Sequence, residues 1–281
     1  MDRFEPVSPG HKVKLNGVSA ERPGNLSKSE IESRTLKLMA ELSELQELLF
    51  AAGTHGLLIV LQGRDTSGKD GTIRHLLQCM NAQSTRVVPF KVPTPKELSH
   101  DFLWRVHAQT PSRGETVLFN RSHYEDVLVV RVHNLVPEAV WSKRYDQINQ
   151  FEGLLAENST ILVKFCLHIT PEEQESRLLD REKELEKAWK LSVGDWKERE
   201  FWDRYTEAYE TALRQCSSDA APWFIVPANS KTYRNYLVTR ALVERLRPFR
   251  DEWKQSLESL GARAKAELEE YRKSKSDNAP A

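Results

Sequence analysis

The sequence has no long hydrophobic run. Its longest purely aliphatic stretch is LLIVL at residues 57–61, far below the roughly 20 apolar residues that a transmembrane helix requires. The opening residues, MDRFEPVSPG, contain no apolar core of a signal peptide. We therefore expect a soluble protein that does not act at a membrane.

Cysteine is also scarce. The three cysteines lie far apart and form no C-x-x-C pair, so the sequence suggests neither secretion nor zinc binding. With no sign of a signal peptide, this composition favours the cytoplasm. The cysteines are Cys79, Cys166 and Cys216.

A net charge is absent as well. The chain carries 41 basic and 41 acidic residues, which balance to a formal charge of zero. Proteins that bind nucleic acid through a generally basic surface carry an excess of lysine and arginine. The balance therefore excludes general nucleic-acid binding of that kind, and a polyanionic ligand would need a local patch of positive charge.

The length of 281 residues is enough for one large α/β domain with a full core. Residues 1–27 are polar and interrupted by proline and glycine, which predicts an irregular N-terminal arm. Residues 262–281 are polar and predict a helical tail that frays. The domain itself is expected to span residues 28–261.

A helix is expected to open this domain. Ser27 or Ser29 can cap its N-terminus. Four leucines then follow at helical spacing, which gives the helix an apolar face that can pack on the core. They are Leu38, Leu42, Leu45 and Leu49.

Five short apolar runs follow, and helix-compatible sequence separates each run from the next. This alternation predicts an α/β fold with a parallel sheet flanked by helices. Parallel strands that are buried on both faces are continuously apolar, as LLIVL, ETVLF and WFIV are. The runs span residues 57–62, 86–90, 116–119, 160–169 and 223–226.

A glycine-rich loop, GRDTSGKDGT, follows the first run and leads into a helix-compatible segment. It satisfies the pattern G-x-x-x-x-G-K with Gly63, Gly68 and Lys69. The glycines let the backbone curl so that successive N–H groups point at phosphate oxygens, while the helix N-terminus and Lys69 add positive charge. The loop is therefore predicted to bind phosphate.

The loop departs from the common pattern at one position. The serine or threonine that usually follows the lysine and touches magnesium is Asp70 here, with Thr72 two positions later. Asp65 is a candidate replacement, because a carboxylate that faces phosphates needs a cation beside it. The alternative is that Asp65 stabilises an Asx-type turn.

A second group of polar residues follows the third run, in FNRSHYED. Such folds bind ligands at the carboxyl end of a strand beside the phosphate loop, so Arg121 is expected to face phosphate. A carboxylate usually holds magnesium at this position, but the chain has Asn120, with Glu125 and Asp126 close by. Which of the three binds metal stays open, and the two acids are alternatively first-turn residues that the helix dipole favours.

Seven ordered blocks of the chain together resemble the second family of polyphosphate kinases, and the match covers about residues 30–247. The blocks are GRDTSGKDGT, KVPTPKELSHDFLWRVH, ETVLFNRSHYEDVLVVRV, WSKRYDQINQFEGLL, FCLHITPEEQESRL, KAWKLSVGDWKEREFWDRYTEAYE and APWFIVPANSKTYRN. The resemblance implies a thymidylate-kinase-like P-loop fold with a helical lid. It also implies bound magnesium, with manganese as a substitute, inorganic polyphosphate as phosphoryl donor and a nucleoside mono- or diphosphate as acceptor.

Carried over onto this chain, the resemblance implies a catalytic set of Asp65, Lys69 and Arg121, with the lid at about residues 177–200. Arg131, which aliphatic residues flank, is counted with the phosphate-binding candidates. These candidates are Gly63, Gly68, Asp70, Gly71, Thr72, Arg74, Arg131, Arg177, Arg181, Lys187 and Lys190. Candidates for bordering the nucleotide base follow the second run and are Phe90, Lys91 and Pro93.

We therefore expect a kinase that moves phosphoryl groups reversibly between inorganic polyphosphate and AMP or ADP. The block NRSHYEDVLV resembles the branch of the family that uses both mono- and diphosphates. The alternative enzyme is an ATP-dependent nucleotide kinase of similar fold. A regulatory GTPase is disfavoured because the sequence has no guanine-reading N-K-x-D tetrapeptide. The aromatic-rich helices lead us to expect a homo-oligomer, either a dimer or a tetramer.

Overall fold

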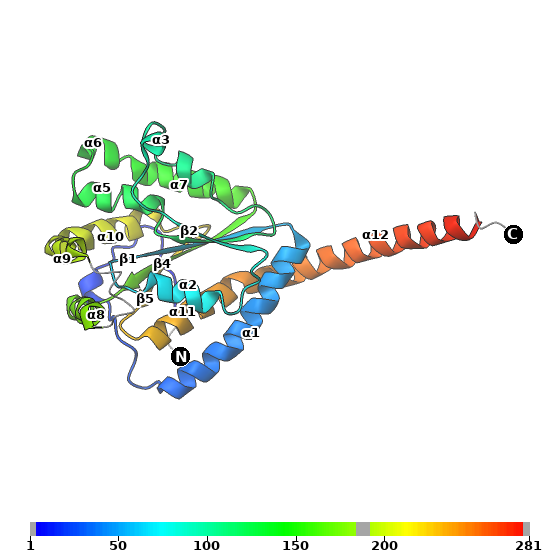
Figure 1. Cartoon of the computed structure of the whole chain (residues 1–281), viewed down its shortest axis with the longest axis horizontal. Helices are drawn as coiled ribbons and strands as arrows, with labels where there is room; N and C mark the ends of the chain where they lie inside the picture. Colours follow the sequence, from blue (N-terminus) through cyan, green and yellow to red (C-terminus); the bar gives the residue numbers. More distant parts are fainter. Residues whose placement is uncertain (1–3, 184–191, 278–281) are drawn as a thin grey trace.

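The computed structural model describes residues 4–183 and 192–277. Its centre is a five-stranded sheet in which neighbouring strands are all parallel, in the order β2-β3-β1-β4-β5 (Figure 1). Each predicted apolar run is one of these strands, so the expected α/β fold is confirmed. The strands are β1 (Gly56–Gly63), β2 (Thr85–Pro89), β3 (Thr116–Asn120), β4 (Thr160–His168) and β5 (Trp223–Pro227).

Helices lie on both faces of the sheet (Figure 1). The α-helices are α1 (Lys28–Ala52), α2 (Lys69–Leu76), α3 (Pro95–Leu98), α4 (Trp104–His107), α5 (Val129–Val132), α6 (Glu138–Trp141), α7 (Arg144–Glu157), α8 (Pro171–Lys183), α9 (Val193–Glu198), α10 (Trp202–Cys216), α11 (Lys231–Leu246) and α12 (Arg250–Asp277). The 3-10 helices are η1 (Leu15–Gly17), η2 (His123–Asp126), η4 (Arg199–Phe201) and η5 (Arg247–Phe249).

Strand β1 shows why both faces of the sheet are covered. All of its residues are buried. Leu57, Ile59 and Leu61 pack with residues of α1, α2 and α11 in one core cluster. Leu58 and Val60 pack with residues of α7 and α10 in the other. Because side chains alternate along a strand, a continuously apolar strand needs an apolar layer on each side.

Ser27, rather than Ser29, caps helix α1. The Ser27 Oγ accepts a hydrogen bond from the Glu30 N–H, and the Glu30 carboxylate accepts one from the Ser27 N–H, which makes a capping box. The helix ends at Gly53, whose φ of +61° is the left-handed conformation common at helix ends. The predicted leucine face packs on the core, with Leu42, Leu45 and Leu49 buried and Leu38 partly buried.

The N-terminal arm lies against the edge strand β5. The Val7 N–H donates to the Trp223 carbonyl oxygen at 2.8 Å, and the Ser217 hydroxyl donates to the Val7 carbonyl oxygen. Farther along the arm, His168 Nε2 lies 3.1 Å from the Val18 carbonyl oxygen. An edge strand presents unpaired backbone groups, so the arm shields part of β5.

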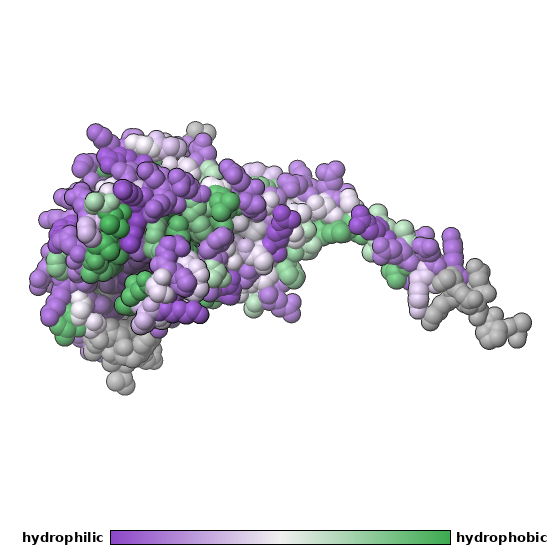
Figure 2. Space-filling model, turned by 90° about the horizontal axis from the view of Figure 1, so that it is seen from above, coloured by the Kyte–Doolittle hydropathy of each residue, from purple (hydrophilic) through white to green (hydrophobic). Residues whose placement is uncertain are grey.

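Helix α12 runs without a break through residue 262, where the sequence suggested the start of a separate tail. Trp253, near its beginning, is fully buried in the core, whereas the later part of the helix projects from the body (Figure 1). Figure 2 shows hydrophobic residues exposed along this projection. Within the described ranges, no helix is long and apolar enough to cross a membrane.

Candidate active site

The phosphate loop joins the central strand β1 to helix α2. Gly63 has a φ of +154°, and a β-carbon there would lie only 2.6 Å from the Ser67 Oγ, so only glycine fits without a shift. Gly68, at the N-terminus of α2, has a φ of +102°. The loop therefore curls as predicted and presents the N-terminus of α2, with its partial positive charge.

Lys69 is buried at the start of α2. Its ammonium group donates to the carbonyl oxygens of Gly63 at 2.8 Å and Arg64 at 3.2 Å. Burial and the nearby Arg121 lower the pKa of Lys69 to about 8, against the opposing effect of Asp65. A phosphate in this loop would add negative charge that favours the protonated ammonium group.

Arg121 follows β3, the neighbour of β1, with a φ of +64° that residues other than glycine seldom adopt. Its guanidinium group donates to Asp65 at 2.6 Å and to Glu125 at 3.3 Å. Burial opposes the charge of Arg121, but Glu125 and Asp65 outweigh burial and raise its pKa. The end of β3 is thus joined to the phosphate loop through charged side chains.

Asp70 and Asn120 meet beside this ion pair. The Asn120 Nδ2 donates to the Asp70 Oδ1 at 2.9 Å. At position 70 the chain therefore has an acid, where the common phosphate loop has a serine or threonine. At position 120 it has an amide, where the common strand end has a carboxylate. An aspartate at position 120 would place two carboxylates side by side, and the amide avoids this repulsion.

A cavity of about 530 Å³ opens over the N-terminus of α2, and we call it the phosphate cavity. The phosphate loop, the end of β3, α8 and α11 all contribute to its lining. Its acidic lining residues are Asp65, Asp70 and Asp180. Its basic lining residues are Lys69, Arg74, Arg121, Arg177, Arg181, Lys231 and Arg234. A chain of zero net charge thus concentrates positive charge here.

Two arginines predicted to belong to the lid line this cavity. Arg177 donates to the Thr66 carbonyl oxygen at 2.8 Å, which fastens α8 to the phosphate loop. Arg181 pairs with Asp195 of α9 at 2.6 Å. The two remaining predicted cations lie outside the described residues, and they are Lys187 and Lys190.

Two of the predicted site residues, Asp126 and Arg131, have their partners on α7 and α10. Asp126, a metal candidate, pairs with Arg144 at 2.8 Å, and burial raises the pKa of Asp126 to about 6 against the effect of Arg144. Arg131, a phosphate candidate, donates to the Tyr145 and Thr211 hydroxyls at 3.2 and 2.9 Å. Neither residue is among the described residues that line the phosphate cavity.

The residues predicted to border the base follow β2. The Phe90 ring is buried, with its centroid 4.8 Å from that of Phe119, and the Arg105 guanidinium lies 5.2 Å from it. The ring therefore packs largely within the core. Phe90 and Lys91 line a separate open cavity of about 490 Å³, and Pro93 is partly buried.

The sequence of this chain matches one family of known proteins over most of its length. Residues 25–254 match the family described as Polyphosphate kinase 2 (PPK2). The chain belongs to the polyphosphate kinase 2 family. The resemblance carried by the seven sequence blocks is thereby confirmed.

Relatives and a solved structure of this family extend the match. The AMP/ADP-polyphosphate phosphotransferase of Meiothermus ruber is 54% identical over 209 residues, 74% of this chain and 78% of the relative. The ADP-polyphosphate phosphotransferase of Rhodopseudomonas palustris is 42% identical over 251 residues, 85% of this chain and 87% of the relative. The crystal structure of polyphosphate kinase 2 from Arthrobacter aurescens TC1 is 40% identical and aligns with a TM-score of 0.82, covering 87% of this chain and 91% of that one. The P-loop kinase fold is therefore confirmed.

This polyphosphate kinase 2 family member also has a small cavity, about 30 Å³, that no sequence pattern indicated. Asp65 and Arg121 line it together with aromatic side chains of α10. The Arg64 guanidinium lies 3.7 Å from the Trp202 ring and donates to the Trp202 carbonyl oxygen. The only sequence signal for this cavity was the spacing of the aromatic residues in WDRYTEAY. The same spacing is typical of a helix that packs on a core, so it did not identify a cavity.

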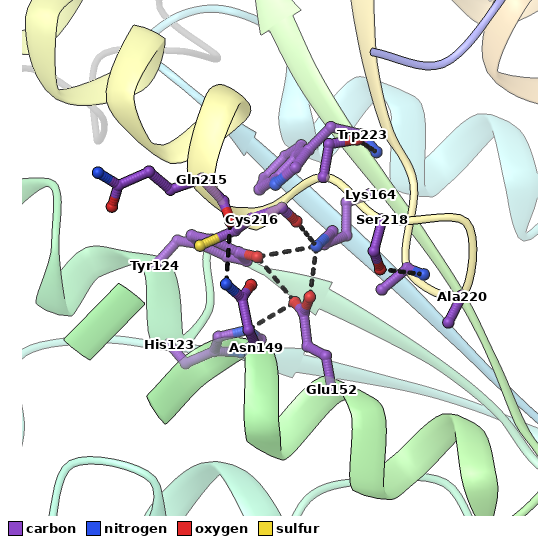
Figure 3. A network of polar contacts seen from close by, with 12 residues as sticks. His123, Tyr124, Asn149, Glu152, Lys164, Gln215, Cys216, Ser218, Ala220 and Trp223 are labelled. Atoms are coloured by element: carbon purple, nitrogen blue, oxygen red, sulfur yellow. Dashed lines mark hydrogen bonds and ion pairs between the residues drawn. The ribbon is translucent and has the colours of Figure 1, made fainter. Parts of the chain in front are cut away.

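A buried polar network supports the segment that carries Arg121 (Figure 3). Lys164, fully buried in β4, pairs with the Glu152 carboxylate of α7. Lys164 also donates to the Tyr124 hydroxyl at 2.8 Å and to the Cys216 carbonyl oxygen at 2.6 Å. The Tyr124 hydroxyl in turn donates to Glu152 at 2.8 Å.

His123 completes the network and stays neutral. Burial lowers the pKa of His123, and its Nε2 lies 3.1 Å from the Glu152 carboxylate, which accepts the hydrogen bond. Burial would favour a protonated Glu152, but Lys164 and His123 outweigh burial and lower the pKa of Glu152. Because η2 begins two residues after Arg121, these buried contacts position the segment that carries Arg121 and Glu125.

Proposed function

We propose that this protein transfers phosphoryl groups from inorganic polyphosphate to AMP and ADP, and in the reverse direction. The observation that carries the proposal is the phosphate cavity, where basic side chains outnumber acidic ones over the N-terminus of α2. Relatives named AMP/ADP-polyphosphate and ADP-polyphosphate phosphotransferases support this choice of donor and acceptor.

In this reaction a terminal phosphate oxygen of the nucleotide forms a bond to the terminal phosphorus of polyphosphate. The bond from that phosphorus to the bridging oxygen breaks, and the shortened chain leaves with the electron pair. The transition state is loose and rich in negative charge, so positioned cations provide most of the catalysis. In this proposal Lys69 and Arg121 provide that charge, and Arg121 pairs with Asp65 and Glu125. The reaction needs no protein nucleophile.

We also propose that Asp65 helps to hold Mg²⁺, with Mn²⁺ as a substitute. Asp65 and Glu125 both direct a carboxylate oxygen to Arg121 beside the phosphate loop. Among the described residues there is no cluster of three or more metal-ligating side chains. Mg²⁺ fits this arrangement because it binds through one or two carboxylates, several waters and substrate phosphates. When bound, the ion supplies positive charge to phosphate oxygens.

The Asp65→Asn variant should need more Mg²⁺ for half-maximal activity than the wild type. An amide is a weaker ligand than a carboxylate, and we expect a rise of at least about tenfold, which corresponds to a binding loss of about 1.4 kcal/mol. Initial rates across a Mg²⁺ titration measure this. Asp126→Asn is the matched control, because Asp126 pairs with Arg144 away from the cavity. An unchanged titration for Asp65→Asn, or a larger effect of Asp126→Asn, would contradict the assignment of the metal to Asp65.

AMP supplied with excess polyphosphate and Mg²⁺ should pass through ADP and reach ATP in one reaction. A cavity lined by long arginine and lysine side chains tolerates a shift in the position of the acceptor phosphate better than fixed backbone donors do. A time course followed by nucleotide chromatography, with protein free of adenylate kinase, measures this. Accumulation that stops at ADP would contradict the dual acceptor. Phosphorylation of AMP by ATP but not by polyphosphate would favour the ATP-dependent kinase instead.

A homo-oligomer, a dimer or tetramer, remains our proposal for the assembly. The projecting part of α12 exposes Leu260, Leu268 and Tyr271. A helix with little packing along its length is only marginally stable in water, which supports a partner for this segment. The cytoplasmic location likewise stays a prediction from the sequence.

A further inference from the structure

The N-terminal arm crosses the carboxyl ends of β4 and β5, at the edge of the sheet where folds of this class bind their ligands. The arm lies before residues 25–254, which match the family. Beyond its contact with His168, the arm reaches Asn229, which follows the end of β5. The Asn229 N–H donates to the carbonyl oxygen of the buried Ala20 at 3.1 Å, and the Asn229 Nδ2 donates to the Glu21 carboxylate. The arm is therefore anchored at the edge of the sheet that carries the active site.

Asn229 uses both ends of its side-chain amide. Its Oδ1 accepts from the Thr170 N–H at 3.2 Å, while its Nδ2 donates to Glu21. An amide carries an acceptor and a donor group in one plane, so a single asparagine can join an N–H group to a carboxylate. The opposite orientation would set the amide oxygen against the Glu21 carboxylate and the amide NH2 against the Thr170 N–H. The two partners therefore fix the direction in which the amide points.

Thr170 begins α8, the helix that leads into the predicted lid. Its hydroxyl accepts from the Glu173 N–H at 3.2 Å and its carbonyl oxygen accepts from the Gln174 N–H at 3.0 Å, so Thr170 caps the helix. The backbone of Asn229 reaches the same helix, because its carbonyl oxygen accepts from Arg177 at 2.8 Å. Asn229 thus holds α8 both at its cap and farther along its length.

Helix α8 in turn holds the phosphate loop. The Gln174 Nε2 donates to the Asp65 carbonyl oxygen at 3.1 Å, and Arg177 donates to the Thr66 carbonyl oxygen at 2.8 Å. Thr66 has a φ of +66°, a left-handed conformation that is unfavourable for residues other than glycine and persists only where surrounding contacts hold it. Two side chains of α8 therefore hold consecutive backbone carbonyls at a strained point of the loop.

We propose that Asn229 is a positioning residue for phosphoryl transfer, and that Glu21 of the N-terminal arm holds its amide in the required orientation. This rests on the proposed function and deepens it. Neither residue is among the described residues that line the phosphate cavity, so Asn229 acts through α8 on the backbone of the loop. Because a misplacement of about 1 Å at a reacting group can cost roughly a hundredfold in rate, such a support affects catalysis without contacting a substrate.

The Asn229→Ala variant should lower kcat with polyphosphate and ADP at least about tenfold, because the cap of α8 loses its hydrogen bond and the two loop carbonyls that α8 holds shift. Initial rates at saturating substrates and Mg²⁺, well below the Tm of each variant, measure this. At such temperatures nearly all of the protein is folded, so a loss of stability alone leaves kcat unchanged. Asn158→Ala is the matched control and should keep the wild-type kcat, since its amide donates to the Leu154 carbonyl oxygen at the end of α7.

A second pair of variants tests the arm. Asn229→Asp keeps an acceptor for the Thr170 N–H but sets a carboxylate against that of Glu21. Because Glu21 is exposed and water screens the repulsion, we expect a smaller loss of kcat, about threefold. Adding Glu21→Gln supplies a donor to the new carboxylate and should recover most of this loss. A double variant no more active than Asn229→Asp would overturn the role of the arm.

The outcomes separate positioning from a purely structural role. A lower Tm for Asn229→Ala with kcat at the wild-type level would overturn the proposal, and so would an equal loss of kcat in Asn158→Ala. If Asn229→Ala does not fold, the isosteric Asn229→Asp and its recovery by Glu21→Gln decide between the two roles. A wild type that cannot use polyphosphate would instead refute the proposed function, so the two failures are distinguishable.

Discussion

Replacing Lys69 with alanine should lower kcat/KM for phosphoryl transfer at least about a hundredfold, because a cation that acts on the transferring phosphate contributes several kcal/mol. Lys69 is buried in the phosphate loop, and its ammonium group lies within hydrogen-bonding distance of two loop carbonyl oxygens. Initial rates with polyphosphate and ADP measure the effect. Lys37→Ala, at an exposed position of α1, is the control and should retain wild-type activity. Near-normal activity of Lys69→Ala would remove the loop from the mechanism.

The pH dependence of the wild-type kcat/KM tests the same residue. Burial and Arg121 lower the pKa of Lys69 to about 8, so its ammonium group is charged below that pH and neutral above it. Because kcat/KM reports ionisations of the free enzyme, it should fall as the pH rises through about 8. Lys69→Arg should move this alkaline decline to higher pH, since arginine keeps its charge. A decline that Lys69→Arg leaves in place would belong to another group.

Replacing Lys164 with methionine should lower the free energy of unfolding by roughly 3–5 kcal/mol, because Glu152 would then hold a buried charge without its cation. The Lys164 ammonium group contacts Glu152, the Tyr124 hydroxyl and the Cys216 carbonyl oxygen, and all of these partners are buried. Such a loss is a large share of the roughly 5–15 kcal/mol that stabilises a typical protein. Equilibrium unfolding in urea measures it.

Two further variants show whether burial causes this effect. Lys14 pairs with Glu210 at 3.0 Å, but its side chain is 83% exposed, so Lys14→Met should cost less than about 1 kcal/mol. Adding Glu152→Leu to Lys164→Met should recover part of the loss, because it removes the stranded charge. A loss for Lys164→Met no larger than that for Lys14→Met would contradict a stabilising buried pair.

The parts of the fold that depend on neighbours along the chain were predictable from the sequence. The continuous apolar run of β1 indicated a strand covered on both faces, and the structure places a core cluster on each side of it. The presence of a serine cap on α1, although not the choice between Ser27 and Ser29, and the curl at Gly63 and Gly68 likewise follow from local backbone requirements. Residues at fixed short spacing carry these signals, so a single sequence contains them.

The partners of the charged side chains depended on the tertiary structure. Glu125 and Asp126 are adjacent in the sequence, yet Glu125 accepts from Arg121 while Asp126 turns to Arg144. Such pairings follow from the helices that pack beside η2, which the local sequence does not specify.

Arg234 shows the same limit in the phosphate cavity. The sequence alone established a phosphate loop, five strands and the family to which the chain belongs. It did not show that a residue of α11 reaches Gly68, because no short-range pattern connects them. The strand order β2-β3-β1-β4-β5 and the packing of α11 beside α2 bring these distant segments together. Backbone propensity acts between near neighbours, whereas the charges that share a cavity are selected by long-range packing, so only the tertiary structure decided them.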